Sequence, residues 1–314
     1  MRRFEFHGTE MAVPIRIVLY GTDNATAARA AEAALSRFRQ LNGVMSDYDP
    51  QSELRRLCEA STEGKAVSVS DDLWRVLVRA QGLSERSGGA FDVTAGPLVR
   101  LWRSARRTKE LPRPESIASA KAKVGYRFMR LNADRHTVEL LRPKMQIDLG
   151  GIAKGYAVDE ALHVLRQRGF AAAMIDAGGN LGLGDAPPDK LGWRIGVAPP
   201  DIGRPPRQYL RLSRAALSTS GDLWQHAVID GVRYSHLIDP RTGMALTGRM
   251  SVTVVGPDGL STDGLSSAAA ILGPEKGMKL IEDTPGAAGL MVSVVDGKET
   301  VRESSRWKML SKAE

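Results

Sequence analysis

The sequence predicts an α+β fold in one compact domain, and three observations support this prediction. Segments with the apolar periodicity of helices and short segments rich in Val, Ile and Leu occur in mixed order, without the strict alternation of a parallel α/β protein. The 314 residues contain no internal repeat and no low-complexity segment. No stretch has the composition of a linker, so we expect one compact domain over residues 1–314, with two lobes around a cleft.

The first half of the chain is expected to be mainly helical after an initial strand. In chain order the expected elements are a strand at 13–20 and helices at 25–41, 52–57, 71–87 and 115–124. The strand is rich in Ile and Val. The first helix has Ala30, Ala34 and Phe38 on one side at helical spacing. The third helix has Ser70 as its expected N-cap and ends at two glycines.

The second half mixes short strands with helices. Expected strands, each a short apolar run, are at 128–132, 137–141, 145–149, 171–175, 193–197, 234–237, 250–255 and 290–295. Expected helices are at 152–168, 263–272 and 275–281. Gly169 ends the first of these, and Gly273 followed by Pro274 separates the other two because proline cannot continue a helix. Residues 199–206 are Pro-rich and predict a surface loop, and the Ser-Thr-Ser-Gly at 218–221 predicts a turn.

The charge balance favours an anionic partner without identifying it. The net charge is +8 and the pI about 9.7, which suits a nucleotide, nucleic acid or anionic lipid, but also a merely solvated basic surface. Aromatic residues make up only 5%, and the most basic segment, residues 100–113, lacks regular aromatic interleaving, so we expect no nucleic-acid partner. No apolar run reaches the ~20 residues of a membrane-spanning helix, so we expect no transmembrane segment.

The start of the chain bears on the compartment, and the cysteine content bears on disulfides and metal sites. The start, MRRFEFHGTEMAV, has two arginines but no apolar core behind them and does not resemble a signal peptide. We therefore expect a cytoplasmic protein, with a periplasmic or inner-membrane-associated location as the alternative if a leader was removed. Cys58 is the sole cysteine, which excludes an internal disulfide and a multi-cysteine metal site.

The segment IDLGGIAKGYAVDEAL, residues 147–162, places an acid, two glycines and a lysine at an expected helix start. Free N–H groups at a helix start favour an anion, and Lys154 adds a positive charge. Asp148 can accept hydrogen bonds from a ligand, and the glycines let a backbone carbonyl approach it closely. The spacing matches neither the P-loop nor the dinucleotide fingerprint. A tight strand-to-helix turn with a surface lysine is the structural alternative.

Two further segments carry candidate chemistry. Asp263 and Ser267 are four residues apart and share a helix face, so with carbonyl oxygens and a ligand phosphate they could hold Mg²⁺ or Ca²⁺. The alternative is an Asp and a Ser that favour a helix start. His236 precedes the turn at 239–243 in a strand-like run and is the best general acid or base of the five histidines. The alternative is a strand histidine held by one hydrogen bond.

Two loop segments are less specific. GGAFDVTAGPL, from Gly88, brings Phe91 and Asp92 to the end of a helix, where Phe91 could stack on a ligand or pack in the core. MSDYDPQSEL, from Met45, places Tyr48 on a polar loop. Both are also ordinary loop chemistry.

Together these segments resemble the ApbE family, the FAD:protein FMN transferases. The matching segments, in order, are MSDYDPQSEL, GGAFDVTAGPLVRLW, IDLGGIAKGYAVDEA, DAGGNLGLG, LSTSGD, YSHLIDPRTG and SVTVVGP…STDGLSSAAAILG. They span residues 45–273, and seven motifs in the same order are highly specific. The resemblance implies an ApbE-like, T-fold-related α+β fold of mixed sheet and helices. It also implies an FAD cleft between two lobes and Mg²⁺ at the diphosphate.

The resemblance also implies residue roles. Positions that contact FAD in the family fall on Met11, Tyr48, Ala90, Phe91, Asp92, Asp148, Lys154 and Ile238. Metal positions fall on the Gly151 carbonyl, Asp263 and Ser267, and the histidine that assists proton transfer falls on His236. The family's usual Met-Gly-Thr appears here as Met-Ala-Val at 11–13, and Ser267 stands where threonine is commoner.

The implied reaction transfers FMN from FAD, through its phosphate, to a Ser or Thr hydroxyl of an acceptor flavoprotein, and releases AMP. The expected acceptor is a subunit of a respiratory or redox complex. Two alternatives use the same residues: an FAD pyrophosphatase that forms FMN and AMP, and an FAD-binding protein without turnover. Retention of Asp263, Ser267 and His236 argues against storage alone, because storage needs neither a metal nor a base.

Overall fold

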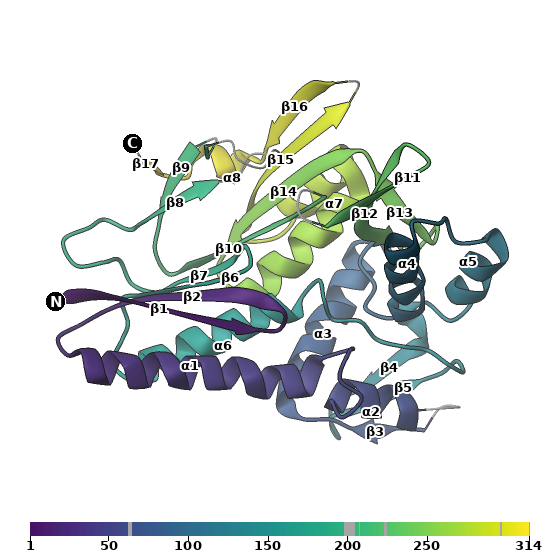
Figure 1. Cartoon of the computed structure of the whole chain (residues 1–314), viewed down its shortest axis with the longest axis horizontal. Coiled ribbons are helices and arrows are strands. Elements are labelled where there is room, and N and C mark those ends of the chain that lie inside the picture. The colour runs from purple at the N-terminus through teal and green to yellow at the C-terminus, as the bar shows by residue number, and fades with distance from the viewer. Residues whose placement is uncertain (62–64, 198–204, 207, 223–224, 296, 314) are drawn as a thin grey trace.

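The computed structural model describes residues 1–61, 65–197, 205–206, 208–222, 225–295 and 297–313. Figure 1 shows helices packed against a large twisted sheet, with smaller sheets at its margins, so the expected α+β class is confirmed. The helices are α1 (Asn24–Met45), α2 (Glu53–Ala60), α3 (Asp71–Arg86), α4 (Gly96–Thr108), α5 (Pro114–Lys121), α6 (Ala153–Gln167), α7 (Gly259–Glu282) and α8 (Ser305–Lys308). None of these helices is both long and apolar enough to cross a bilayer.

The main sheet has eight strands, and all its neighbours are antiparallel. In spatial order they are β1 (Arg2–Glu10), β2 (Val13–Gly21), β6 (Ala173–Ala177), β7 (Asn180–Leu183), β10 (Ala215–Gly221), β14 (Arg249–Gly256), β15 (Ala288–Val295) and β16 (Lys298–Glu303). Three small sheets are formed by β11 (His226–Ile229), β12 (Val232–Asp239) and β13 (Met244–Thr247); by β17 (Lys312–Ala313), β9 (Gln208–Leu212) and β8 (Trp193–Val197); and by β3 (Val67–Ser68), β5 (Thr137–Leu140) and β4 (Met129–Asn132).

Side chains alternate between the two faces of the main sheet, and each face has its own cover. On β2, Ile17 joins the core beneath α1, α6 and α7, whereas the next residue, Val18, joins a second core under β8, β9 and α8. Met291 and Val292 on β15 divide in the same way. Because both faces are covered, the strands carry apolar residues on both sides.

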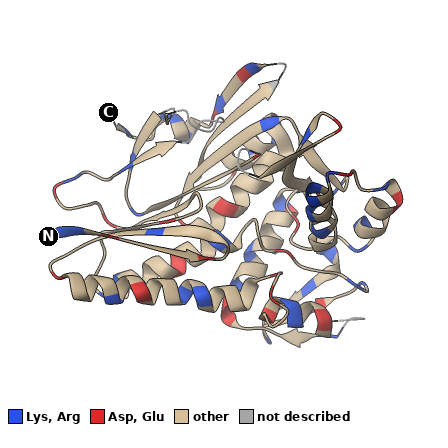
Figure 2. Ribbon diagram, viewed as in Figure 1, with Lys and Arg blue, Asp and Glu red and all other residues tan. Residues whose placement is uncertain are grey.

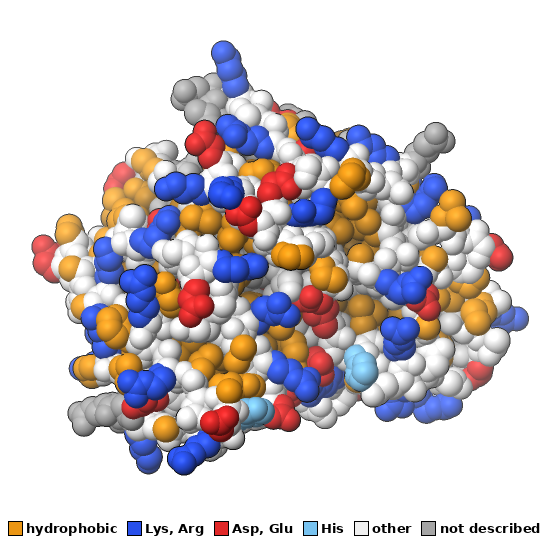
Figure 3. Space-filling view, turned by 180° about the vertical axis from the view of Figure 1, so that it is seen from behind, with side chains coloured by type: hydrophobic (Ala, Val, Ile, Leu, Met, Phe, Trp, Pro, Cys, Tyr) orange, Lys and Arg blue, Asp and Glu red, His pale blue; other side chains and the backbone are white. Residues whose placement is uncertain are grey.

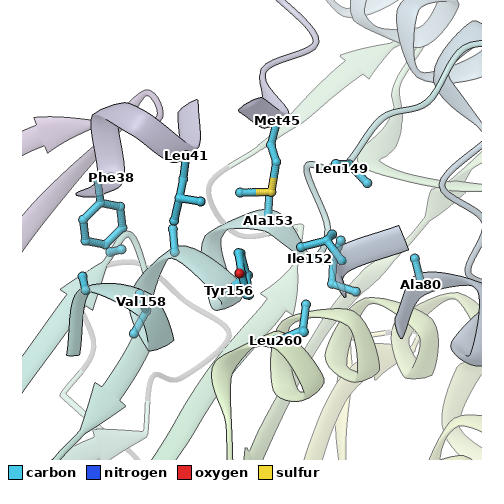
Figure 4. Packing of buried hydrophobic residues seen from close by; sticks show 14 of the residues in the cluster. Phe38, Leu41, Met45, Ala80, Leu149, Ile152, Ala153, Tyr156, Val158 and Leu260 are labelled. Atoms are coloured by element: carbon cyan, nitrogen blue, oxygen red, sulfur yellow. The ribbon is translucent and has the colours of Figure 1, made fainter. Parts of the chain in front are cut away.

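The largest core joins α1, α3, α6 and α7. Phe38, Leu41 and Met45 of α1 point toward α6, which carries Ala153, Tyr156 and Val158, and Leu260 lies at the start of α7 (Figure 4). This packing fixes the N-terminal end of α6 against that of α7. A third, separate core forms where α4 and α5 pack on β12 and β13.

Several expected boundaries are confirmed to within a few residues, and others are wrong. Ser70 does cap α3, with its hydroxyl accepting from the Leu73 N–H. The expected strand at 145–149 is absent apart from one bridge at Gln146. The predicted turn at 218–221 is instead part of β10 in the middle of the main sheet. The loop expected at 199–206 lies outside the described residues except for 205–206.

The structure adds elements that the sequence did not predict, including β1 and α4. Residues 259–282 run as one helix with a break at Gly273, where φ is 78°, so the separation before Pro274 is confirmed but the helix begins earlier than expected. In Figure 2, blue bands that mark Lys and Arg recur along the ribbon of α4. On the opposite side of the molecule Lys and Arg are interspersed with Asp and Glu (Figure 3).

Candidate functional site

The N-terminal ends of α6 and α7 touch through two glycines. A Cβ added to Gly155 would fall on the carbonyl oxygen of Gly259, and one added to Gly259 would lie 2.5 Å from that of Gly155. The backbones therefore meet with no side chain between them. This contact brings the side chains on the first turns of α6 close to those on the first turns of α7.

Each helix is capped by a carboxylate from the other. The Gly155 N–H donates to Asp263 Oδ2 of α7 at 3.0 Å, and α6 has no side-chain cap of its own at Ile152. In return, the carboxylate of Asp159 accepts from the N–H groups of Gly259, at 2.7 Å, and Leu260, at 2.9 Å. Burial raises the pKa of Asp159 to about 7, against the opposing effect of these two hydrogen bonds. We call this arrangement the reciprocal cap.

Oxygen donors gather beside the reciprocal cap. Gly151 lies against Ser267, because a Cβ on that glycine would be 3.3 Å from Ser267 Oγ and 3.4 Å from the Phe91 ring. Asp263 Oδ1 makes no hydrogen bond within the described residues, although Oδ2 is used by the cap. The Lys154 ammonium donates to the Gly150 carbonyl at 2.7 Å and lies 4.0 Å from Asp263 Oδ2. The predicted metal residues are therefore brought together.

This donor set fits a hard cation better than a soft one. Across the described ranges, no group of three or more His, Cys, Asp or Glu side chains could hold a metal. A cation here would depend on one carboxylate, the Ser267 hydroxyl and a carbonyl, with further ligands from a substrate phosphate or water. Such oxygen ligands suit Mg²⁺, which keeps several sites for phosphate and water.

His236 is arranged to act as a base. Its Nδ1 lies 3.2 Å from the Gln225 carbonyl oxygen, which can only accept, so Nδ1 carries the proton and Nε2 is free to accept one. Burial lowers the pKa of His236 to about 4, assisted by the positive charges of Arg106 and Lys154. The ring is therefore neutral at physiological pH.

Asp148 and Tyr48 meet at an arginine that the sequence did not single out. The Arg103 guanidinium donates to Asp148 Oδ2 at 2.7 Å and also to Asp47, and it lies 4.4 Å from the centre of the Tyr48 ring. Burial and the nearby Asp47 raise the pKa of Asp148, while Arg103 opposes this shift. Tyr48 itself is 72% exposed, which leaves the outer face of its ring open to a ligand.

Other predicted residues have mainly internal contacts. The Asp92 carboxylate accepts from the Thr94 N–H and hydroxyl and from the Tyr126 N–H, so it is already satisfied. Ala90 is buried, and Ile238 lies in the third core with α4. A ligand could therefore use only the backbone of Ile238, not its side chain.

Met11 is in the two-residue turn between β1 and β2. Both Met11 and Ala12 have positive φ, at 50° and 59°, as a type I′ hairpin requires. The Met11 side chain is half-buried against the main core. No hydrogen bond or ion pair joins it to the other predicted site residues in the described parts of the chain.

Two arginines of α4, Arg103 and Arg106, lie beside the predicted site residues and were missed by sequence reasoning. The available signal was the run of basic residues in the segment 100–113, which was interpreted only as a test for nucleic-acid binding. Its three-residue spacing places Arg103 and Arg106 on one side of a helix, but the helix was not predicted.

Comparison with known proteins agrees with this geometry. A model described as "ApbE family" matches residues 9–291. The "FAD:protein FMN transferase" of Vibrio cholerae is 33% identical over 87% of this chain and 82% of its own length, and that of Haemophilus influenzae is 30% identical over 93% and 86%. The solved "Flavin Transferase ApbE from Vibrio cholerae" superposes with a TM-score of 0.87 at 30% identity, covering 98% of this chain and 99% of that one. The apo flavinyl transferase ApbE of Pseudomonas stutzeri gives 0.87 at 28% identity, covering 100% and 98%.

Proposed function

The chain belongs to the ApbE family, and we propose that it is a magnesium-dependent FAD:protein FMN transferase whose site is the junction of α6 and α7. The enzyme transfers a flavinyl group, as its relatives are named for doing. One observation chiefly supports the assignment to this junction. The donors Gly151, Asp263 and Ser267 converge there. Lys154 lies among them, and its positive charge also lowers the pKa of the neutral base His236.

The reaction exchanges one phosphorus–oxygen bond for another. The hydroxyl oxygen of an acceptor Ser or Thr bonds to the phosphorus on the FMN side of FAD. The bond from that phosphorus to the bridging oxygen breaks, and its electron pair leaves with AMP. The hydroxyl proton passes to Nε2 of His236 and is then lost to solvent. The products are FMN-protein and AMP.

The residues of the site divide this work by charge and geometry. Phosphoryl transfer needs positioning and charge neutralisation more than covalent catalysis. A bound Mg²⁺ would supply neutralisation at the diphosphate, held by Asp263, Ser267 and the Gly151 carbonyl. Lys154 adds a mobile positive charge on the same side, while the exposed ring of Tyr48, supported by Arg103, offers a stacking surface.

The main competing function is hydrolysis of FAD to FMN and AMP, in which water replaces the acceptor hydroxyl at the same phosphorus. A product assay separates the possibilities. Wild-type enzyme with FAD, Mg²⁺ and a candidate acceptor should give a fluorescent flavinylated band on a denaturing gel faster than it gives free FMN. Rapid FMN release that is indifferent to every acceptor would favour the hydrolase, and unchanged FAD would favour a binding protein.

We further propose that the acceptor is a redox-complex subunit and that transfer takes place in the cytoplasm, with the periplasm or inner-membrane surface as the alternative. The turn at 239–243 is a candidate docking rim because it follows His236 on β12. Arg241 in this turn is bound to Asp239 by two hydrogen bonds of 2.8 Å, so it would meet an acceptor as part of a rigid turn. The segment 218–221 is unsuited to docking, because Ser218 and Ser220 are buried in the sheet.

A further inference from the structure

Two arginines on α4, one turn apart, have different surroundings. Arg103 uses its guanidinium fully on Asp47, Asp148 and the Tyr48 ring. Arg106 is half-buried, yet it makes no hydrogen bond or ion pair with any residue that the structure describes. Burial and the neighbouring charge of Arg103 both lower the pKa of Arg106. Holding an unpaired cation in this position costs free energy, which an anionic ligand would recover.

The position of α4 directs Arg106 toward the reaction site. α4 packs on β12, the strand that carries His236. The ring centroids of Trp102 and Tyr234 are 5.3 Å apart, and Trp102 Nε1 donates a hydrogen bond to the Gly243 carbonyl at 2.8 Å. The positive charge of Arg106 contributes to lowering the pKa of His236, as does that of Lys154. Arg106 also interacts electrostatically with Tyr48. Two cations thus approach the same base from different helices, α4 and α6.

We propose that Arg106 is a further substrate-binding residue for the reaction, with its guanidinium bonded to phosphate oxygens of the FAD diphosphate. This inference rests on the proposed function. A guanidinium presents two parallel N–H donors to a phosphate, and it stays protonated throughout. As the acceptor oxygen bonds to phosphorus and the electron pair moves to the AMP oxygen, Arg106 stabilises the charge that is redistributed. The proton still goes to His236.

The chain offers a matched control in the next residue. Arg107 is exposed on a different side of α4 and carries the same charge. The experiment measures kcat and KM for covalent FMN transfer in Arg106→Gln, Arg106→Lys and Arg107→Gln. We expect Arg106→Gln to lower kcat/KM by about 10²-fold or more, since arginines on transferred phosphoryl groups contribute ~10³–10⁵ in kcat. Arg106→Lys should keep part of the lost kcat/KM. Arg107→Gln removes the same unit of net charge as Arg106→Gln, so it measures the effect of net charge alone, and its kcat/KM should stay within about twofold of wild type.

A binding measurement keeps this test separate from the transferase assignment. Inorganic pyrophosphate titrated into each variant by calorimetry should bind Arg106→Gln about tenfold or more weakly than wild type or Arg107→Gln, as expected for a lost charge-assisted bond. The unliganded melting temperature of Arg106→Gln should not fall and should rise slightly, because Arg106 has no partner to lose and its unpaired charge costs free energy. Unaltered pyrophosphate affinity and kcat/KM in Arg106→Gln, or equal losses in Arg107→Gln, would overturn the inference. If wild type only hydrolyses FAD while Arg106→Gln still binds pyrophosphate more weakly, the role of Arg106 in binding the diphosphate stands and the transferase assignment fails.

Discussion

Asp263 has two carboxylate oxygens with different tasks. Oδ2 caps α6 through the Gly155 N–H, and Oδ1 is available to a cation. A substitution can therefore damage the helix, the metal site or both. Replacing the carboxylate with an amide separates the two effects, because an amide oxygen can still accept from Gly155.

We expect Asp263→Asn and Asp263→Ala both to abolish flavinyl transfer while leaving FAD binding weakened but measurable. The alanine variant should in addition lose the cap, which typically costs about 0.5–2 kcal/mol of stability. Transfer is measured by in-gel flavin fluorescence, and stability by denaturant unfolding. Full activity in either variant, or in wild type with excess EDTA, would contradict the metal role.

His236 should act as a base over an unusually wide pH range. Because its pKa is lowered to about 4, the acid limb of kcat that belongs to this residue should lie near pH 4 rather than near pH 6.5. His236→Ala should reduce the rate by roughly 10²–10⁴-fold with FAD affinity little changed. A limb near pH 6.5 that disappears in His236→Ala would show that the ring is not held neutral.

The same shift links His236 to stability. Its folded-state pKa is below the unfolded value, so its contribution is fully present above about pH 6.5 and is lost as pH falls toward 4. The stability difference between wild type and His236→Ala, followed by urea unfolding across this window, should therefore change with pH. A difference that is constant from pH 7 to pH 4.5 would count against a ring that is held neutral.

Motif residues could be identified from sequence, but their partners could not. Asp148, Asp263 and His236 stand in segments whose residue types indicate ligand chemistry at short range. Arg103 is 45 positions from Asp148 and 56 from Asp47, and only the folded chain brings them together. The structural use of Asp92 was equally hidden, because its partner Tyr126 is 34 positions away.

At the scale of elements, sequence patterns identified α1 and α3 but failed at β10 and at residues 145–149. α1 and α3 show helical periodicity because one side faces water. β10 is covered on both sides, and its Ser218, Thr219 and Ser220 bond to side chains of α7 and β14, so small hydroxyl residues there were mistaken for a turn. Met145, Ile147 and Leu149 are apolar because they pack in the core, not because they pair in a sheet.

The helix crossing makes its own prediction. Gly155→Ala would drive a methyl group into the Gly259 backbone, and overpacking of this kind costs about 1–3 kcal/mol. Because the crossing also positions Asp263, transfer should fall as well. Gly82→Ala is the control: Gly82 lies inside α3 with open space around its added Cβ, and alanine there should stabilise by about 0.5–1 kcal/mol. Equal effects of the two substitutions on the urea midpoint would refute close contact at the crossing.

Over the whole molecule, the main sheet supports the site from one side only. α1, α6 and α7 lie on the face that carries the site, while β8, β9 and α8 cover the other face. The metal-binding part of the site, on α6 and α7, is thus part of the largest core, so binding there should change the free energy of global unfolding.

Metal binding should therefore raise the stability of the entire chain. A ligand that binds only the folded state stabilises it by about 2.7 kcal/mol at 100 times its Kd. Saturating Mg²⁺ should raise the melting temperature of wild type by several degrees, and Asp263→Asn should lose most of this rise. Calorimetry with and without EDTA measures it. The same shift in wild type and Asp263→Asn would place the cation elsewhere.

The reciprocal cap also has a consequence for how the protein folds. Its hydrogen bonds join residues 100 and 108 positions apart, so α6 lacks its side-chain cap, and α7 has only its own cap at Asp258, until the two helices dock. Closing so long a loop is entropically slow, and contacts of this kind form late. On the ribosome, the first turn of α6 would stay frayed until the segment around residue 259 has been synthesised and has docked. Assembly of the site is therefore among the last events of folding, and a nascent chain that ends before α7 should lack the metal site.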